Sequence, residues 1–297
     1  MHSTQLLIFG GLFIGFAIKV PMFPFHTWMP DAHTEAPTVA SVLLAAVMLK
    51  LGAYGFIRIA LPIIPDAAVS FAPWIGLLAV IGIIYGALGC LAQRDMKRLI
   101  AFSSLAHMGF VMLGIATLTA LGINASIFAM VGHGLITGML FFLAGSIESR
   151  IKSRDLERFG GLLSVAPQLT WVLGFCAMAS LGMPGLAGFW GEFSAILAAF
   201  SPAPALPLAT FRVYMVLGAV GTVLAAGYLL WMYQRIAFGH VSETVKAQEV
   251  GDVTRSEYVT WAPLLVLIVV LGVYPALLFD ISNPAVTEMV QRFGERQ

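Results

Sequence analysis

Apolar residues occur along this chain in long continuous stretches that are separated by short polar loops. Each stretch is about 20 residues or longer, enough to cross ~30 Å of hydrocarbon as a helix, and none alternates like a barrel strand. Eight spans are expected, at residues 5–24, 38–61, 73–92, 99–119, 123–147, 165–200, 213–238 and 259–279. The pattern predicts an all-α polytopic membrane protein, because continuous apolar segments satisfy their backbone groups in lipid only as helices.

Composition agrees with a chain embedded in a lipid bilayer. The 297 residues are 59% hydrophobic and 10% charged, whereas about a quarter of the residues in a soluble domain are charged. The net charge of +1 argues against a nucleic-acid partner. Cys90 and Cys176 both lie inside apolar runs and are expected to act as small core residues.

Basic residues are shared unequally between the two sets of loops. One set carries Arg94, Lys97, Arg98, Arg150, Lys152, Arg154, Arg158, Arg235, Lys246 and Arg255, and the other carries Arg58, Arg212, Arg292 and Arg296. Cytoplasmic loops are rich in Lys and Arg, so the first set is predicted to be cytoplasmic and both termini to lie on the outer side. Dividing the span at 165–200 into two would reverse this assignment for the loop after residue 238.

Five ionisable residues are predicted to lie at mid-membrane depth on five different spans: Lys19, Lys50, His107, His133 and Glu192. A charge at this depth costs at least ~2.5–3.5 kcal/mol, so such groups usually face a protein interior and serve transport. A single buried histidine is often only a packing residue. Five groups at one depth predict a polar axis suited to proton relay.

Proline interrupts two of the spans close to these charges. Pro21 and Pro24 follow the lysine of the first span, and Pro184 with Gly185 precedes the glutamate of the sixth. Proline cannot donate to the carbonyl four residues earlier, so a half-helix ends there with free carbonyl groups. Discontinuous helices with ionisable residues are typical of transporter folds built from inverted repeats.

Four segments resemble the antiporter-like subunits of respiratory complex I: AIKVPMFPFHTWMPDAHTEAPTVASVLLAAVMLKLGAYGFIR, RDMKRLIAFSSLAHMGF, HGLITGMLFFLAGSIESR and LGMPGLAGFWGEF. DAHTEAPT followed by LKLGAYG is typical of the chain M members of that family. The resemblance implies a proton-pumping membrane subunit of NADH-quinone oxidoreductase in the bacterial plasma membrane. Such a subunit carries out no redox chemistry itself.

The resemblance also implies roles for individual residues. Lys19 matches the lysine of the first broken helix, and Lys50 matches the lysine that connects the two halves through histidines equivalent to His107 and His133. Glu192 matches the terminal site from which the proton leaves. NADH, FMN, iron–sulfur clusters and quinone are expected on partner subunits, with no cofactor or metal in this chain. Membrane subunits of the L and N type are the expected partners.

Members of the chain M type usually have about fourteen spans, and this sequence matches the seventh to the fourteenth. The resemblance therefore divides the chain into the last two helices of a truncated first repeat (1–62), a complete five-helix second repeat (73–238), and a C-terminal loop, helix and tail (239–297). The glutamate that pairs with Lys19 in the family lies on an earlier helix. A fragment, a split gene product or a misplaced start is expected, and alone it is not expected to pump.

Two other functions are compatible with parts of the sequence. A subunit of an Mrp-type Na⁺/H⁺ antiporter would use the same lysines and glutamate. A b-type cytochrome would use His107 and His133 as axial ligands, but this alternative leaves the lysines and the glutamate unexplained.

The segment FHTWMPDAHTE contains a group of metal-ligand residue types: His26, Asp31, His33 and Glu35. Their spacing matches no standard metal site. A polar helix end that gathers protons or anchors the loop is the favoured interpretation.

Overall fold

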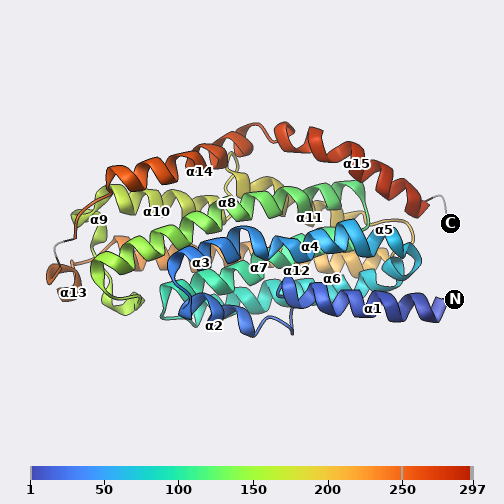
Figure 1. Cartoon of the computed structure of the whole chain (residues 1–297), viewed down its shortest axis with the longest axis horizontal. Coiled ribbons are helices and arrows are strands. Elements are labelled where there is room, and N and C mark those ends of the chain that lie inside the picture. Colours follow the sequence, from blue (N-terminus) through green and yellow to red (C-terminus); the bar gives the residue numbers. More distant parts are fainter. Residues whose placement is uncertain (1, 249, 295–297) are drawn as a thin grey trace.

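The computed structural model of the protein describes residues 2–248 and 250–294, and helices make up almost all of this part (Figure 1). Arg296, used in the topology argument, lies outside the described residues, and only the backbone of Arg292 is described. Within the described residues, six helical segments are long and apolar enough to cross a membrane: Thr38–Ile63, Pro65–Leu91, Met96–Ala116, Ala120–Ile151, Leu208–Ala237 and Arg255–Val273. Two shorter apolar helices, Ser3–Lys19 and Ala187–Phe200, belong to the two spans predicted to be interrupted.

The helices and helical turns follow one another with short connections. Their bounds are α1 (His2–Lys19), α2 (Trp28–Glu35), α3 (Thr38–Leu43), η1 (Leu44–Met48), α4 (Lys50–Gly55), η2 (Phe56–Ala60), α5 (Leu61–Ile63), α6 (Pro65–Leu91), α7 (Met96–Ala116), α8 (Ala120–Ile151), η3 (Leu156–Arg158), α9 (Leu162–Val165), α10 (Pro167–Ser180), α11 (Ala187–Phe200), α12 (Leu208–Ala237), α13 (Glu243–Lys246), α14 (Arg255–Val273) and α15 (Ala276–Gly294).

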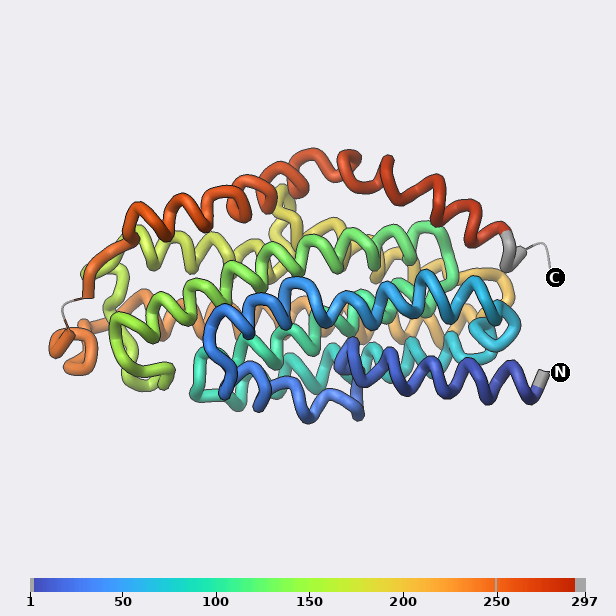
Figure 2. Tube along the Cα trace, in the orientation of Figure 1, coloured from blue at the N-terminus to red at the C-terminus, as the bar shows by residue number. Residues whose placement is uncertain are grey.

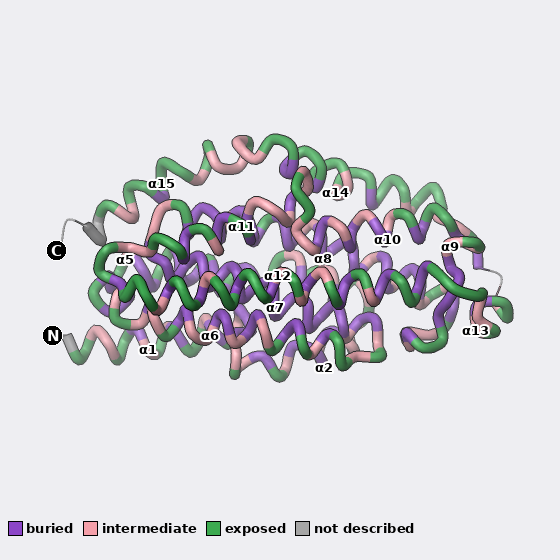
Figure 3. The backbone as a smooth tube through the Cα atoms, turned by 180° about the vertical axis from the view of Figure 1, so that it is seen from behind, coloured by how far each residue is buried: buried purple, intermediate pink, exposed green. Residues whose placement is uncertain are grey.

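The long helices lie side by side along the long axis of the molecule, and both ends of the chain lie at the same end of the bundle (Figures 1 and 2). This placement agrees with an even number of crossings. The helices α7 and α8 are the most completely buried of the long ones and form the centre of the bundle (Figure 3). The division into repeats at 1–62, 73–238 and 239–297 stays a prediction.

Both predicted helix breaks are confirmed. The first span does not run to residue 24 as one helix, because α1 ends at Lys19 and the chain becomes helical again at Trp28. The sixth span divides into α10 and α11, which are joined by residues 181–186. Gly182 and Gly185 have φ values of 81° and 91° there, a conformation that only glycine adopts without strain.

The prediction of one continuous helix over 259–279 is wrong. The helix α14 ends at Val273, and a further helix, α15, begins at Ala276 and continues through what was expected to be a tail. Pro275 explains the break, because a proline disfavours the helical conformation of the residue before it, and Tyr274 is indeed non-helical with φ −126° and ψ 72°.

The start of the third predicted span at residue 73 is also wrong. The helix α6 begins at Pro65 and contains Pro73. Proline is favoured in the first helical turn, where its missing N–H has no intrahelical partner to lose. Pro65 therefore fits the start of α6, and Pro73 lies inside the helix because membrane helices tolerate internal prolines.

Candidate functional site

The first half of the site is a contact between Lys50 and His133. Lys50 begins α4, directly after the π-helical turn η1, and His133 lies in the middle of α8. The Nζ atom of Lys50 lies 2.7 Å from Nδ1 of His133 and also donates to the carbonyl of Ala45, inside the wide turn. Both side chains are buried. With Lys50 as the donor, Nδ1 accepts, and a neutral His133 carries its proton on Nε2.

The second half is a contact between His107 and Glu192. His107 lies on α7, and Glu192 lies on α11 just after the helix break; the Nδ1 atom of His107 is 2.5 Å from Oε1 of Glu192. The other ring nitrogen, Nε2, lies 3.2 Å from the hydroxyl groups of both Ser180 and Tyr228. Ser180 is the last residue of α10, so side chains from both sides of the break hold one imidazole ring.

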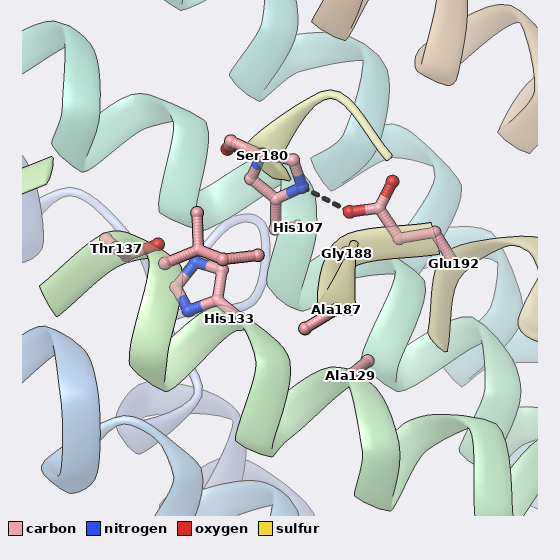
Figure 4. Close-up of a pocket in the computed structure, with 9 residues that line it drawn as sticks. His107, Ala129, His133, Thr137, Ser180, Ala187, Gly188 and Glu192 are labelled. Carbon is pink, nitrogen blue, oxygen red and sulfur yellow. Dashed lines mark hydrogen bonds and ion pairs between the residues drawn. The ribbon is translucent and has the colours of Figure 1, made fainter. Parts of the chain in front are cut away.

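A small cavity of about 20 Å³ lies between the two halves (Figure 4). Its lining includes three polar side chains with buried atoms that have no hydrogen-bond partner, namely Nε2 of His133, Oγ1 of Thr137 and Oε2 of Glu192. The rings of His107 and His133 are 5.6 Å apart between centroids. A cavity of this size has room for one water molecule, and a water bonded to these atoms would join the two halves.

Comparisons with known proteins identify the family of the chain. The family model described as NADH:quinone oxidoreductase/Mrp antiporter, TM, matches residues 1–218. The chain belongs to this family. Subunit M of NADH-quinone oxidoreductase from Rhodobacter capsulatus is 42% identical over 293 residues, which are 98% of this chain and 55% of the relative. The Mycobacterium tuberculosis subunit M is 41% identical over 298 residues, 99% of this chain and 52% of the relative.

Solved structures agree with this membership. Respiratory complex I from Thermus thermophilus with bound NADH contains a chain with a TM-score of 0.87 and 30% identity, with 97% of this chain and 59% of that chain covered. The Mrp complex from Dietzia sp. DQ12-45-1b reaches a TM-score of 0.83 at 20% identity, which shows the shared fold alone. This chain therefore spans about half the length of the curated relatives that it matches.

The structure of this antiporter-family chain brings together four of the five predicted site residues. Lys50, His133, His107 and Glu192 form one continuous buried group. Lys19 is half-buried at the end of α1, and no acidic side chain in the described part of the chain pairs with it.

Ser180 and Tyr228 were not recognised from the sequence as site residues. Ser180 could have been found as the last polar residue before the break. Tyr228 gives no such signal, because tyrosine is common in membrane helices and the sequence does not reveal which neighbour its hydroxyl group meets.

The two other chemistries considered from the sequence receive no support from the geometry. Each of His107 and His133 has its Nδ1 in contact with a charged side chain, and the cavity between them is far below the ~300 Å³ or more of a typical ligand pocket. The proposed metal ligands lie apart: Asp31 pairs with Arg98, and no group of three or more ligand-type residues among residues 2–248 and 250–294 could hold a metal ion.

Proposed function

We propose that this chain moves protons across the membrane as part of a complex of the NADH:quinone oxidoreductase type. The observation that carries the proposal is the buried series Lys50, His133, the cavity, Glu192 and His107, which runs through the middle of the bundle. Each member can bind or release a proton, and neighbours are within hydrogen-bond reach or one water apart. Such a series lets a proton move by short steps through an interior that excludes ions.

The proposed sequence of steps follows the hydrogen bonds. The ammonium group of Lys50 gives a proton to Nδ1 of His133, and His133 releases the proton on Nε2 to a water in the cavity. That water can protonate Oε2 of Glu192, whose other oxygen contacts His107. Glu192 then releases the proton toward the end of the bundle at which α11 ends. No step requires a redox group in this chain.

The names of the relatives and of the similar structures indicate a membrane complex of several subunits. We propose that other membrane subunits, of the L and N type, flank this chain, and that NADH, FMN, iron–sulfur clusters and quinone are bound by partner subunits. An acidic group from outside the described residues is the proposed partner of Lys19. We also propose that the chain lies in a bacterial plasma membrane with both termini on the outer side, because the basic loops lie at the opposite end.

The first test replaces the first proton donor and the last proton acceptor of these steps in the assembled complex. Glu192→Gln and Lys50→Met each remove one proton-binding group while keeping similar side-chain size. In reconstituted vesicles driven by NADH and quinone, proton translocation is expected to fall about 10²-fold, the lower range for loss of a positioned acid or base. An internal pH dye measures the rate, with assembly checked by the recovery of the intact complex.

Matched controls replace the same residue types on the surface. Glu243→Gln and Lys152→Met change exposed side chains away from the series and are expected to translocate protons at the unmodified rate. If Glu192→Gln and Lys50→Met also translocate at that rate, the proposed function is wrong.

The family description also includes Mrp antiporters, which supports a second candidate, Na⁺/H⁺ exchange. The two candidates differ in their driving force. A sodium gradient applied to vesicles without NADH or quinone should produce no pH change if the chain works in a redox complex. A sodium-dependent pH change that Glu192→Gln abolishes would favour exchange.

A further inference from the structure

The helix α14 ends against the link between α10 and α11. Gly272 is the residue before the last of α14, and a Cβ atom there would collide with the carbonyl oxygen of Gly185 and the Cα atom of Leu186. Both are backbone atoms of the link, which reaches the end of α14 in Figure 1. Glycine at residue 272 therefore lets the two segments touch through their backbones.

A hydrogen bond joins α14 to α11 at the same place. The indole Nε1–H of Trp190, in the first turn of α11, donates to the carbonyl oxygen of Gly272 at 2.7 Å. The last four carbonyl groups of a helix have no intrahelical donor, so the indole supplies one that lipid cannot replace. The start of α14 is fixed to α8 by the ion pair between Arg150 and Glu257. The indole is thus bonded to a helix that is itself held at its other end.

Trp190 and Glu192 lie on opposite sides of α11. Two positions correspond to about 200° around an α-helix. With the indole bonded to α14, the carboxyl group lies on the side of α7, where its Oε1 atom is 2.5 Å from Nδ1 of His107. One side of α11 is therefore attached to α14, and the other side carries the proton-binding group.

Close packing sets how near α11 lies to its neighbours, but it does not set the rotation of the helix. A Cβ atom at Gly191 would lie 2.6 Å from the Cα atom of Ala129 on α8. Such van der Waals contact has no preferred direction, whereas a hydrogen bond weakens steeply when its angle departs from linear. The bond between Trp190 and Gly272 therefore resists rotation of α11 about its own axis.

A small rotation of α11 is enough to separate Glu192 from His107. Side-chain ends lie about 5–6 Å from a helix axis, so a rotation of about 30° moves a carboxyl group by about 3 Å. This displacement exceeds the range of a hydrogen bond. The link before α11 opposes the rotation weakly, because Gly182 and Gly185 give its backbone unusual conformational freedom.

We propose that Trp190 is a positioning residue, whose hydrogen bond to the carbonyl of Gly272 sets the rotation of α11 and so holds Glu192 against His107 and the cavity. This inference rests on the proposed function. It adds to that function the helix α14, which lies outside the lining of the cavity. The indole binds and releases no proton itself; it acts only through the carboxyl group two residues further along the chain.

The test separates the indole N–H from the indole ring in the assembled complex. Trp190→Phe keeps an aromatic ring but has no donor. Trp190→Gln loses the ring but carries an amide N–H as many bonds from Cβ as the indole nitrogen. In NADH-driven vesicles, Trp190→Phe is expected to lower proton translocation about fivefold, as for the loss of one hydrogen bond, and Trp190→Gln to stay within about twofold of the unmodified rate. A residue that only packs would give the opposite order.

Matched controls make the same two changes at an exposed tryptophan. Trp171 lies on α10 and is 67% exposed. Trp171→Phe and Trp171→Gln are both expected to translocate protons at the unmodified rate. Rates are compared for equal amounts of assembled complex.

Each outcome decides the proposal. Lower translocation in Trp190→Phe than in Trp190→Gln, with both controls unchanged, supports the positioning role. The proposal is overturned if Trp190→Phe matches the controls, or if Trp190→Gln falls as far as Trp190→Phe or further. Failure of either Trp190 variant to assemble while the Trp171 variants assemble also overturns it, because the tryptophan would then be structural. The proposed function fails separately, if Glu192→Gln translocates normally.

Discussion

Each of the two histidines of the site, His107 and His133, contacts one charged side chain through Nδ1, and they differ in what surrounds Nε2. In His133 this nitrogen has no partner in the described residues, whereas in His107 it lies near the hydroxyl groups of Ser180 and Tyr228. The second nitrogen decides the tautomer of a histidine. We therefore expect His107 to be held in one orientation toward Glu192, and His133 to be free to pass a proton into the cavity.

Tyr228→Phe tests whether the hydroxyl groups position His107. One hydrogen bond is worth about 1 kcal/mol, so the loss of the tyrosine hydroxyl group is expected to lower proton translocation about fivefold. Ser180 still satisfies Nε2 in this variant. In the double variant Tyr228→Phe/Ser180→Ala the nitrogen is buried without a partner, and the loss should exceed the product of the two single effects.

The rate is measured in vesicles with equal amounts of assembled complex. Tyr274→Phe serves as the control, because Tyr274 is 60% exposed. Equal rates for the single and double variants, both matching the control, would show that the hydroxyl groups do not position the ring.

At the scale of helices, proline determines what the sequence could predict. Pro184 removes a backbone donor wherever it lies in a helix interior, so the break between α10 and α11 was predictable. The π-helical turn before Lys50 was not, because LAAVM has ordinary helix formers, and the contact of Lys50 with His133, 83 positions away, leaves no local signal in the sequence. The depth of a residue in the membrane could be predicted from the sequence. The rotation of each helix about its axis, and therefore which side chains of neighbouring helices meet, could not.

The substitution Gly52→Ala tests whether α1 and α4 must pack as closely as the structure shows. A Cβ atom there would lie 2.8 Å from the backbone nitrogen of Val20 and 2.9 Å from the carbonyl oxygen of Phe16. Backbone atoms cannot move aside cheaply, so Gly52→Ala is expected to destabilise the chain by about 1–3 kcal/mol. It should also displace Lys50, which lies two residues earlier, and reduce proton translocation.

Gly15→Ala is the matched control, because nothing lies within 4 Å of the position that its Cβ would take. Alanine is the better helix former, so this variant should be as stable as the unmodified chain or slightly more stable. The midpoint temperature of thermal inactivation of the purified complex measures the stability of the Gly52→Ala and Gly15→Ala variants. Equal midpoints for the two variants would contradict the tight contact between α1 and α4.

For the whole molecule, apart from the His107–Glu192 contact, the ion pairs that the described residues form lie at one end of the bundle, at α2, at the ends of α7, α8 and α14, and in the loops after α6, α8 and α12. Arg150 pairs with Glu257 at 2.7 Å and ties the start of α14 to the end of α8. Asp252 accepts hydrogen bonds from the backbone N–H groups of Gln168 and Leu169 at the start of α10. The loops at this end are thus fixed to one another, while the opposite end contains both termini.

The orientation of the bundle in the membrane can be tested by labelling. Cys90 and Cys176 are both fully buried, so a membrane-impermeant maleimide should react only with an introduced thiol. If the basic loops are cytoplasmic, Glu243→Cys should be labelled in inside-out vesicles and protected in right-side-out ones. Ser3→Cys and Ser201→Cys, at the opposite end, should give the reverse. The same labelling side for Ser3→Cys and Glu243→Cys would contradict an even number of crossings, and a full reversal would place both ends of the bundle opposite to the sides that the basic loops predict.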